Sequence, residues 1–130
     1  MEESRYGLEE FELYQLARQY RIKVYKLIRQ LPSEERYCLA PQMRRAALSV
    51  SNNIAEGHGR WHYRENIQHC RVARGSIEET IDDLNVCLDE CYGNTEIVSA
   101  LKTEALSLIR RVNGYIAYLR KTMQGDEPQT

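Results

Sequence analysis

The densest group of hydrogen-bonding side chains lies in the stretch SVSNNIAEGHGR, residues 49–60. Serine and asparagine are poor residues for a helix interior because their side chains compete for backbone hydrogen bonds. Covalent catalysis would need a nucleophile beside a base, and acid–base catalysis would need two carboxylates facing one cleft. Ser49 has no neighbouring histidine in the sequence, and Glu56 is the only acidic residue of the stretch. We therefore expect no enzyme activity.

These polar side chains follow a helical spacing. Steps of four, four and three residues place Arg45, Ser49, Asn53 and Glu56 along one helix face. Further along the chain, Arg74 occupies a core position in an apolar heptad series, and such an arginine needs a carboxylate partner, for which Glu56 is the best candidate. We interpret the group as a buried network that fixes helix register, with contact to a ligand or partner as the alternative. The predicted network consists of Arg45, Ser49, Asn53, Glu56, Arg74 and Ser76.

Cysteine and histidine side chains are the remaining candidates for chemistry. The four cysteines, Cys38, Cys70, Cys87 and Cys91, lack the spacing of a zinc site. We interpret them as reduced thiols in the core of a cytosolic protein, and a ligand shared by Cys87 and Cys91 is the alternative. The three histidines cluster near Cys70 without the Glu-x-x-His pattern of a metal-binding bundle. We expect no metal and no cofactor.

Apolar residues at alternating spacings of three and four predict four helices that position these side chains. Short links between long helices favour an all-α fold, an up-down-up-down antiparallel four-helix bundle. Gly114 inside the fourth helix predicts the close approach of another helix. One domain should cover residues 1–123, followed by a disordered tail over residues 124–130. The expected helices run from Leu8 to Leu31, from Pro41 to a stop at Gly57 and Gly59, from about residue 67 to 91, and from an N-cap at Thr95 to beyond residue 119.

The composition suits a single domain. The chain has 130 residues, of which 42% are hydrophobic, and this is enough to bury a core. No run approaches ~18 consecutive apolar residues, so neither a transmembrane helix nor a membrane partner is expected. The acidic start MEESRYGLEEFE lacks the basic and apolar regions of a signal peptide. A cytoplasmic location is therefore expected.

The net charge of −1 conceals an uneven distribution. Residues 1–75 have a balance of +4 and residues 76–130 a balance of −5. The first half therefore suits an anionic partner, and the second suits a basic surface, including that of another subunit. The acidic candidates on the third helix are Glu78, Asp82, Asp83, Asp89 and Glu90. The candidates for nucleic-acid binding are Arg18, Lys23, Lys26, Arg29, Arg44, Arg60, Arg64 and Arg71.

An aromatic group lies among these basic residues. Trp61, His62 and Tyr63 stand between Arg60 and Arg64. Aromatic side chains beside arginines can stack on unpaired bases. Hydrophobic closure of the loop between two helices is the alternative.

Two helices have more apolar surface than one bundle needs. A second apolar stripe follows the first helix, and on the fourth helix Ile109 and Ile116 lie one residue beyond the core seam. An apolar stripe on an outer face suggests a partner, which we expect to be a second copy of the chain. The alternative is a wide core stripe whose tyrosines reach water. The predicted interface consists of Phe11, Tyr14, Ile22, Tyr25, Ile109 and Ile116.

Two longer stretches resemble a known family. The stretch PSEERYCLAPQMRRAALSVSNNIAEGHGR, followed by ARGSIEE, is similar to the four-helix-bundle proteins encoded in intervening sequences of bacterial 23S ribosomal RNA. The segment WHYRE, residues 61–65, departs from the pattern, where a Ser or Thr cap is usual. The matching positions are Glu35, Arg36, Leu39, Gln42, Arg45, Ala46, Ser49, Asn53 to Gly57, Gly59, Arg60, Ala73 to Ser76 and Glu79.

This resemblance implies an oligomeric protein without enzyme activity, with a homopentameric ring as the precedent. The family is also similar to the accessory variability proteins of diversity-generating retroelements, which bind a reverse transcriptase and nucleic acid. We therefore expect a scaffold that associates with RNA or DNA, and a retroelement accessory that binds a reverse transcriptase is the specific form of this hypothesis. The alternative is a purely protein-binding adaptor that uses the acidic face of the third helix.

Overall fold

The computed structural model describes residues 7–126, with side chains to Met123. Within this range the chain forms four α-helices and no strand, and this confirms the predicted all-α class. Two short 3-10 turns precede the first and second helices. The elements are η2 Leu8–Glu10, α1 Glu12–Ile28, η3 Ser33–Glu35, α2 Leu39–His58, α3 Tyr63–Asp89 and α4 Thr95–Asp126.

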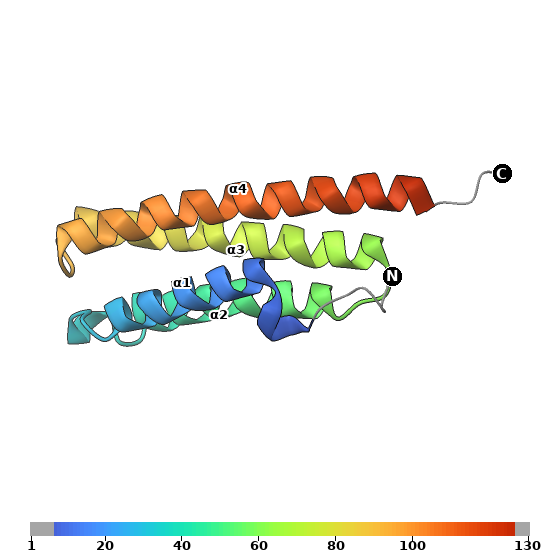
Figure 1. The fold of residues 1–130 in the computed structure, drawn as a ribbon. Coiled ribbons are helices and arrows are strands. Elements are labelled where there is room, and N and C mark those ends of the chain that lie inside the picture. The colour runs from blue at the N-terminus through green and yellow to red at the C-terminus, as the bar shows by residue number, and fades with distance from the viewer. Residues whose placement is uncertain (1–6, 127–130) are drawn as a thin grey trace.

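The chain reverses its direction at each link between helices, as the colour gradient of Figure 1 shows. Contacts between side chains agree with this picture, because residue numbers rise on one helix as they fall on its neighbour. Gln42 contacts Asp83, and Asn53, further along α2, contacts His69, which is earlier in α3. The most extensive helix contacts join α2 to α3, α3 to α4, α1 to α2 and α1 to α4. Helix α1 therefore lies diagonally opposite α3.

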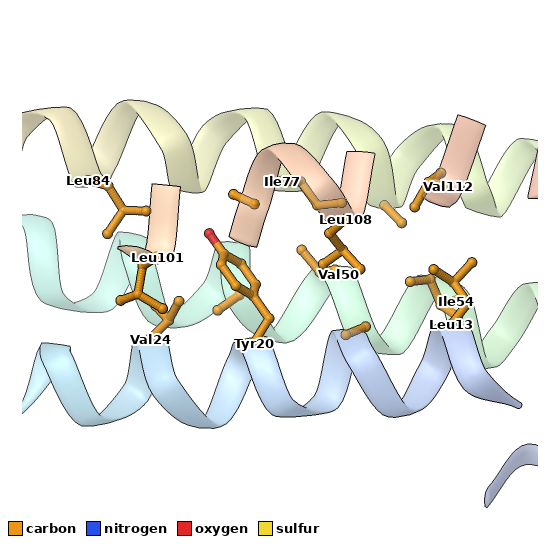
Figure 2. Close-up of a cluster of buried hydrophobic side chains, with 14 of the residues drawn as sticks. Leu13, Tyr20, Val24, Val50, Ile54, Ile77, Leu84, Leu101, Leu108 and Val112 are labelled. Atoms are coloured by element: carbon orange, nitrogen blue, oxygen red, sulfur yellow. The ribbon is translucent and has the colours of Figure 1, made fainter. Parts of the chain in front are cut away.

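Side chains from all four helices fill the core, as Figure 2 shows. The predicted seams are confirmed at positions such as Val24, Ile77 and Val112, which are completely buried. At the centre of the bundle the hydroxyl of Tyr20 lies 2.7 Å from Thr80 Oγ1, across the diagonal between α1 and α3. Because Thr80 donates to the Ile77 carbonyl, Tyr20 donates to Thr80. Burial raises the pKa of Tyr20 to about 12.

The first helix begins at Glu12 rather than at Leu8 because the backbone is extended at Phe11, which ends η2 and caps α1, and it ends at Ile28, before the predicted Leu31. This break directs the Phe11 ring into the core, where its centroid lies 4.9 Å from that of His58 and 5.0 Å from that of Tyr115. Ile116 is also buried, with 3% of its surface exposed. The prediction that Phe11 and Ile116 belong to an outer apolar stripe is therefore wrong.

The start of α2 depends on a carboxylate that precedes it. Glu35 Oε1 accepts a hydrogen bond from the Leu39 backbone N–H at 3.3 Å, so it satisfies a free donor of the first turn. The other oxygen, Oε2, accepts from the Tyr92 hydroxyl at 2.7 Å, which ties this turn to the end of α3. Pro41 lies in the first turn rather than at the first position, and its missing N–H leaves no broken bond there.

The link between α3 and α4 also differs from the sequence-based prediction. The N-cap of α4 is Asn94, whose Oδ1 accepts from the Ile97 backbone N–H at 3.0 Å, and not Thr95 as predicted. Gly93 has a φ of +71°, and a Cβ there would lie 2.8 Å from Leu27 Cδ1. Helix α4 continues to Asp126, past the predicted start of the tail at Gln124, and residues 127–130 lie outside the described part.

Gly114 does not lie against another helix. No heavy atom that the structure describes is within 4 Å of the place where its Cβ would be. The prediction of a close approach at Gly114 is therefore wrong within this chain. The close approach occurs at Gly57, in the contact between α2 and α3.

Candidate nucleic-acid interface and polar network

The interface between α2 and α3 contains a chain of hydrogen bonds. Ser49 Oγ lies 2.8 Å from Ser76 Oγ, which joins the two helices directly. One turn further along α2, Asn53 Nδ2 donates to the Ser49 carbonyl at 2.9 Å and to Ser49 Oγ at 3.0 Å. Bonds to the i−4 carbonyl occupy side chains that would otherwise compete with the helix. The predicted network thus exists at Ser49, Asn53 and Ser76.

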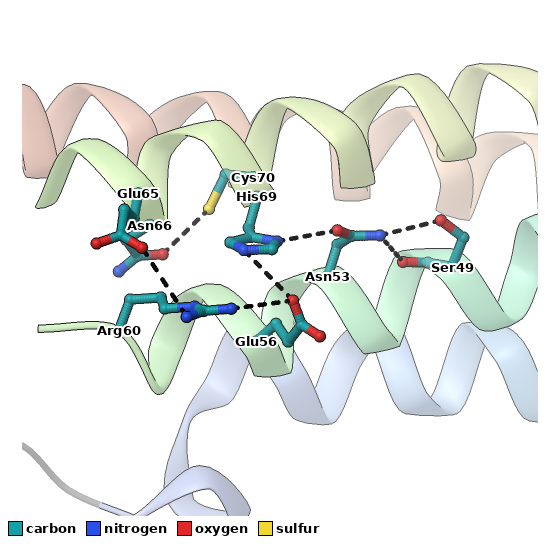
Figure 3. A network of polar contacts seen from close by, with 8 residues as sticks. All are labelled: Ser49, Asn53, Glu56, Arg60, Glu65, Asn66, His69 and Cys70. Atoms are coloured by element: carbon teal, nitrogen blue, oxygen red, sulfur yellow. Dashed lines mark hydrogen bonds and ion pairs between the residues drawn. The ribbon is translucent and has the colours of Figure 1, made fainter. Parts of the chain in front are cut away.

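The network continues through a histidine that the sequence-based prediction did not include. Because Asn53 Nδ2 is a donor to Ser49, Asn53 Oδ1 is the acceptor of a bond from His69 Nδ1, 3.1 Å away. On its other side, His69 Nε2 lies 3.3 Å from Glu56 Oε2. Figure 3 shows this imidazole between the two α2 side chains. The sequence spacing places Asn53 and Glu56 on one face of α2. That His69 lies opposite them depends on the register between α2 and α3, which the sequence does not specify.

Glu56 also holds the end of α2 through Arg60. The Arg60 guanidinium lies 3.6 Å from Glu56 and 3.9 Å from Glu65, so it bridges α2 and the first turn of α3. The predicted pair between Glu56 and Arg74 is therefore wrong. Arg74 is only half-buried and donates to Asn113 Oδ1 of α4 at 2.7 Å. Arg45 is exposed and lies outside the network.

Gly57 allows the two helices to approach closely beside this network. A Cβ at Gly57 would lie 2.6 Å from Asn66 Oδ1 and 3.1 Å from His69 Cβ. Asn66 is itself held in place, since its Nδ2 donates to the Tyr115 hydroxyl at 3.0 Å and its Oδ1 accepts from Cys70 Sγ at 3.6 Å. Gly57 is thus a packing residue inside α2 rather than its stop, and Gly59 is the C-cap.

A second buried polar contact joins the same two helices. Asp83 is fully buried, and its Oδ1 accepts from Gln42 Nε2 at 2.8 Å, while Oδ2 has no hydrogen-bond partner among the described residues. Burial raises the pKa of this carboxyl to about 6, and the Gln42 bond lowers it in part. The prediction that Asp83 belongs to the exposed acidic face is therefore wrong. Glu78, Asp82, Asp89 and Glu90 are exposed.

The network provides hydrogen bonds rather than an activated nucleophile. The imidazole of His69 contacts an amide and a carboxylate, and the serine hydroxyls contact each other. Burial raises the pKa of the Cys70 thiol to about 11, which keeps this thiol protonated at neutral pH. Within residues 7–126, the structure has no cluster of three or more metal-ligating side chains and no helix that is long and apolar enough to cross a membrane.

The predicted nucleic-acid-binding residues lie on two separate faces. Arg18, Lys23 and Lys26 are on α1, diagonally opposite α3, Arg29 is the C-cap of this helix, and two of the four are paired within the chain. Lys23 lies 2.8 Å from Glu104, and Arg18 lies 3.3 Å from Glu9. Arg44 of α2 stacks over Tyr25, at 4.5 Å from the ring centroid.

Arg64 and Arg71, in contrast, line a groove of about 460 Å³ between the start of α3 and the end of α4. Arg120 contributes a third guanidinium from α4, which the sequence alone did not reveal. Among the described residues, no carboxylate lies within ion-pair distance of these three arginines, and Glu65 is the one acidic residue in the lining. Three guanidinium groups around one groove, without a carboxylate partner in the described part of the chain, can contact phosphate oxygens.

The remaining candidates for self-association lie around α1. Ile22 is 55% exposed on the outer face of this helix, while Tyr14, Tyr25 and Ile109 are half-buried and pack against the core. A separate groove of about 270 Å³ follows the contact between α1 and α4, with Ile97 and other apolar side chains in its lining.

Comparisons with known proteins agree with this architecture. A family model described as 23S rRNA-intervening sequence protein matches residues 9–114. The fold is similar to the crystal structure of a protein with unknown function from the S23 ribosomal protein family from Bacteroides thetaiotaomicron. The TM-score is 0.71 at 15% identity, and the match covers 80% of this chain and 97% of that one. No curated protein matches the chain.

Proposed function

The chain belongs to the 23S rRNA-intervening sequence protein family, and we propose that it is a non-enzymatic scaffold that associates with RNA or DNA in the cytoplasm. In this proposal, up-down-up-down bundles assemble into a homo-oligomeric ring, with a pentamer as the family precedent. Each subunit contributes one basic groove. The polar network between α2 and α3 holds α3, which carries Arg64 and Arg71 of this groove, against α2.

The observation that supports nucleic-acid association is the groove lined by Arg64, Arg71 and Arg120. Arginines that are free of carboxylate partners can release counterions when they bind phosphates. Because its net charge is −1, a single subunit attracts a nucleic acid only weakly. A ring repeats the groove in every subunit, and several weak contacts on one strand combine through a high effective concentration.

Two faces on opposite sides of the bundle support assembly. One is basic with an exposed apolar side chain, and the other is acidic. The outer face of α1 has exposed Ile22 with Lys26 and Arg29, while the outer face of the diagonal helix α3 has Asp82 and Asp89. A basic face on one copy then complements an acidic face on the next. Contacts between two different faces are heterologous, and such contacts give rings where the rotation closes.

A retroelement accessory role is the specific form of this proposal. The resemblance to accessory variability proteins suggests a reverse transcriptase as the protein partner, held beside its RNA by the ring. An adaptor that binds only protein is the second candidate. The exposed carboxylates Glu78, Asp82, Asp89 and Glu90 on α3 favour a basic partner.

A gel-shift assay over a salt series separates the two candidates. Nucleic-acid association through the groove predicts retarded RNA and DNA, with an affinity that falls steeply as salt rises. An adaptor predicts no retardation of either nucleic acid at any salt concentration. Light scattering on the same preparation should give a multiple of the subunit mass of 15.2 kDa, and a single-subunit mass would contradict the assembly.

A further inference from the structure

Trp61 lies in the link between α2 and α3, close in sequence to the first residues of the basic groove. It lies two residues before the first residue of α3 and three before Arg64, which lines the groove. Its side chain is 61% exposed. The loop is closed by other residues, since Tyr63 packs against the core and Arg60 bridges Glu56 and Glu65. Hydrophobic closure of the loop therefore does not explain Trp61.

We propose that Trp61 is a base-stacking residue and that the groove accepts an unpaired strand of RNA or DNA rather than a duplex. An exposed indole offers a flat face for a base, and every base offers a face in return. In a duplex the bases are already stacked on each other, so the indole would find no free face. This inference rests on the proposed nucleic-acid association and specifies the form of its ligand.

The spacing of the arginines agrees with a short single-stranded segment. Arg64 and Arg71 are seven residues apart on α3, which is about 10 Å at 1.5 Å per residue. This length corresponds to about three nucleotides of a stacked strand. Arg120 faces the same groove from α4, so the phosphates would lie between two helices. The base at one end of this segment would then reach Trp61.

The sequence provides a direct probe, because Trp61 is the only tryptophan in the chain. A single-stranded oligouridine is titrated into the full-length protein while intrinsic tryptophan fluorescence is recorded. Stacking should quench this emission with the same midpoint as binding measured with a labelled oligonucleotide. The matching RNA duplex should produce little quenching over the same concentration range.

Two variants and a matched control complete the test. Trp61→Ala should weaken binding of the single strand by about fivefold to a hundredfold, and Trp61→Phe should restore part of the loss. Tyr37→Ala is the control, because Tyr37 is an exposed aromatic residue, 87% accessible, near the start of α2 at the other end of the bundle. Tyr37→Ala should leave binding unchanged.

The outcomes distinguish this inference from the function on which it rests. If the oligonucleotide binds while Trp61 emission and the Trp61→Ala affinity stay unchanged, stacking is overturned and the groove proposal remains. Equal affinity of the groove for the duplex would overturn the preference for an unpaired strand. If neither single-stranded nor duplex RNA or DNA binds, the nucleic-acid association itself is overturned, and the inference falls with it.

Discussion

The hydroxyl oxygens of Ser49 and Ser76 lie 2.8 Å apart across the contact between α2 and α3. This bond joins the two sequence stretches that are most similar to the family pattern. Ser49 also accepts from Asn53 Nδ2, and Asn53 in turn contacts His69. The polar side chains of this stretch therefore connect two helices and hold α3, which carries Arg64 and Arg71, against α2.

Removal of Asn53 should weaken the bundle. Asn53→Ala deletes the bonds to Ser49 and His69, and we expect the free energy of unfolding to fall by about 1–2 kcal/mol. Urea unfolding followed by circular dichroism measures this change. Asn52→Ala is the matched control, since Asn52 is exposed on the same helix. An equal effect of the two substitutions would show that the network adds no stability.

Two glycine substitutions should act in opposite directions. Gly57→Ala places a Cβ 2.6 Å from Asn66 Oδ1, and the forced separation of α2 and α3 should cost about 1–3 kcal/mol. Gly75→Ala meets open space on α3 and should stabilise the helix by about 1 kcal/mol. Thermal unfolding of both variants checks the signs. A stabilised Gly57→Ala variant would contradict the close approach.

Asp83 should make stability depend on pH. Its carboxyl pKa is raised from 3.8 to about 6 in the folded protein, so the folded state binds more protons than the unfolded state between these values. The contribution to stability is complete below about pH 4 and is lost as the pH rises to about 6. Asp83→Asn should remove this loss and raise stability at pH 7 by an amount on the order of 3 kcal/mol.

The control for this pH effect is the exposed neighbour Asp82. Asp82→Asn should leave the pH profile of the unfolding midpoint between pH 4 and 7 close to that of the unmodified protein. If Asp83→Asn keeps the same decline across this window, burial of the Asp83 carboxylate is not its cause.

Assembly should depend on the outer face of α1. Ile22→Asp introduces a charge on an apolar side chain that is 55% exposed, and we expect the mass from light scattering to fall towards that of one subunit. Leu48→Asp on α2, at 39% exposure, is the control and should keep the oligomer. Loss of assembly in the control alone would place the interface on α2 instead.

The helical periodicity correctly predicted core residues such as Val24 and Val112. The burial of these residues follows from their spacing along a single helix. It failed at Phe11, where one extended residue redirects the side chain into the core. It also failed at Arg74, which lies beside the seam and reaches Asn113 at the surface, since a long side chain can keep its charged end in water.

The candidate groove could be predicted only in part. Arg64 and Arg71 are basic residues close together in the sequence, but the predicted third helix begins at about residue 67, and only the structure places both of them on α3. Arg120 joins them through the register between α3 and α4, which no local pattern specifies. The exposed-face prediction fails at Asp83 because this residue shares the buried seam of α3 with Ser76, Thr80 and Cys87.

The most direct test of the central claim compares two triple variants of equal charge change in a salt-dependent binding assay with single-stranded RNA. The groove variant is Arg64→Ala, Arg71→Ala and Arg120→Ala, and the control is Arg36→Ala, Arg45→Ala and Arg110→Ala, at exposed residues outside the groove lining. We predict that the groove variant lowers the slope of log affinity against log salt by about 2 for each engaged subunit, while the control keeps it. Equal slopes in the two variants, or a loss confined to the control, would contradict the assignment of the groove as the nucleic-acid interface.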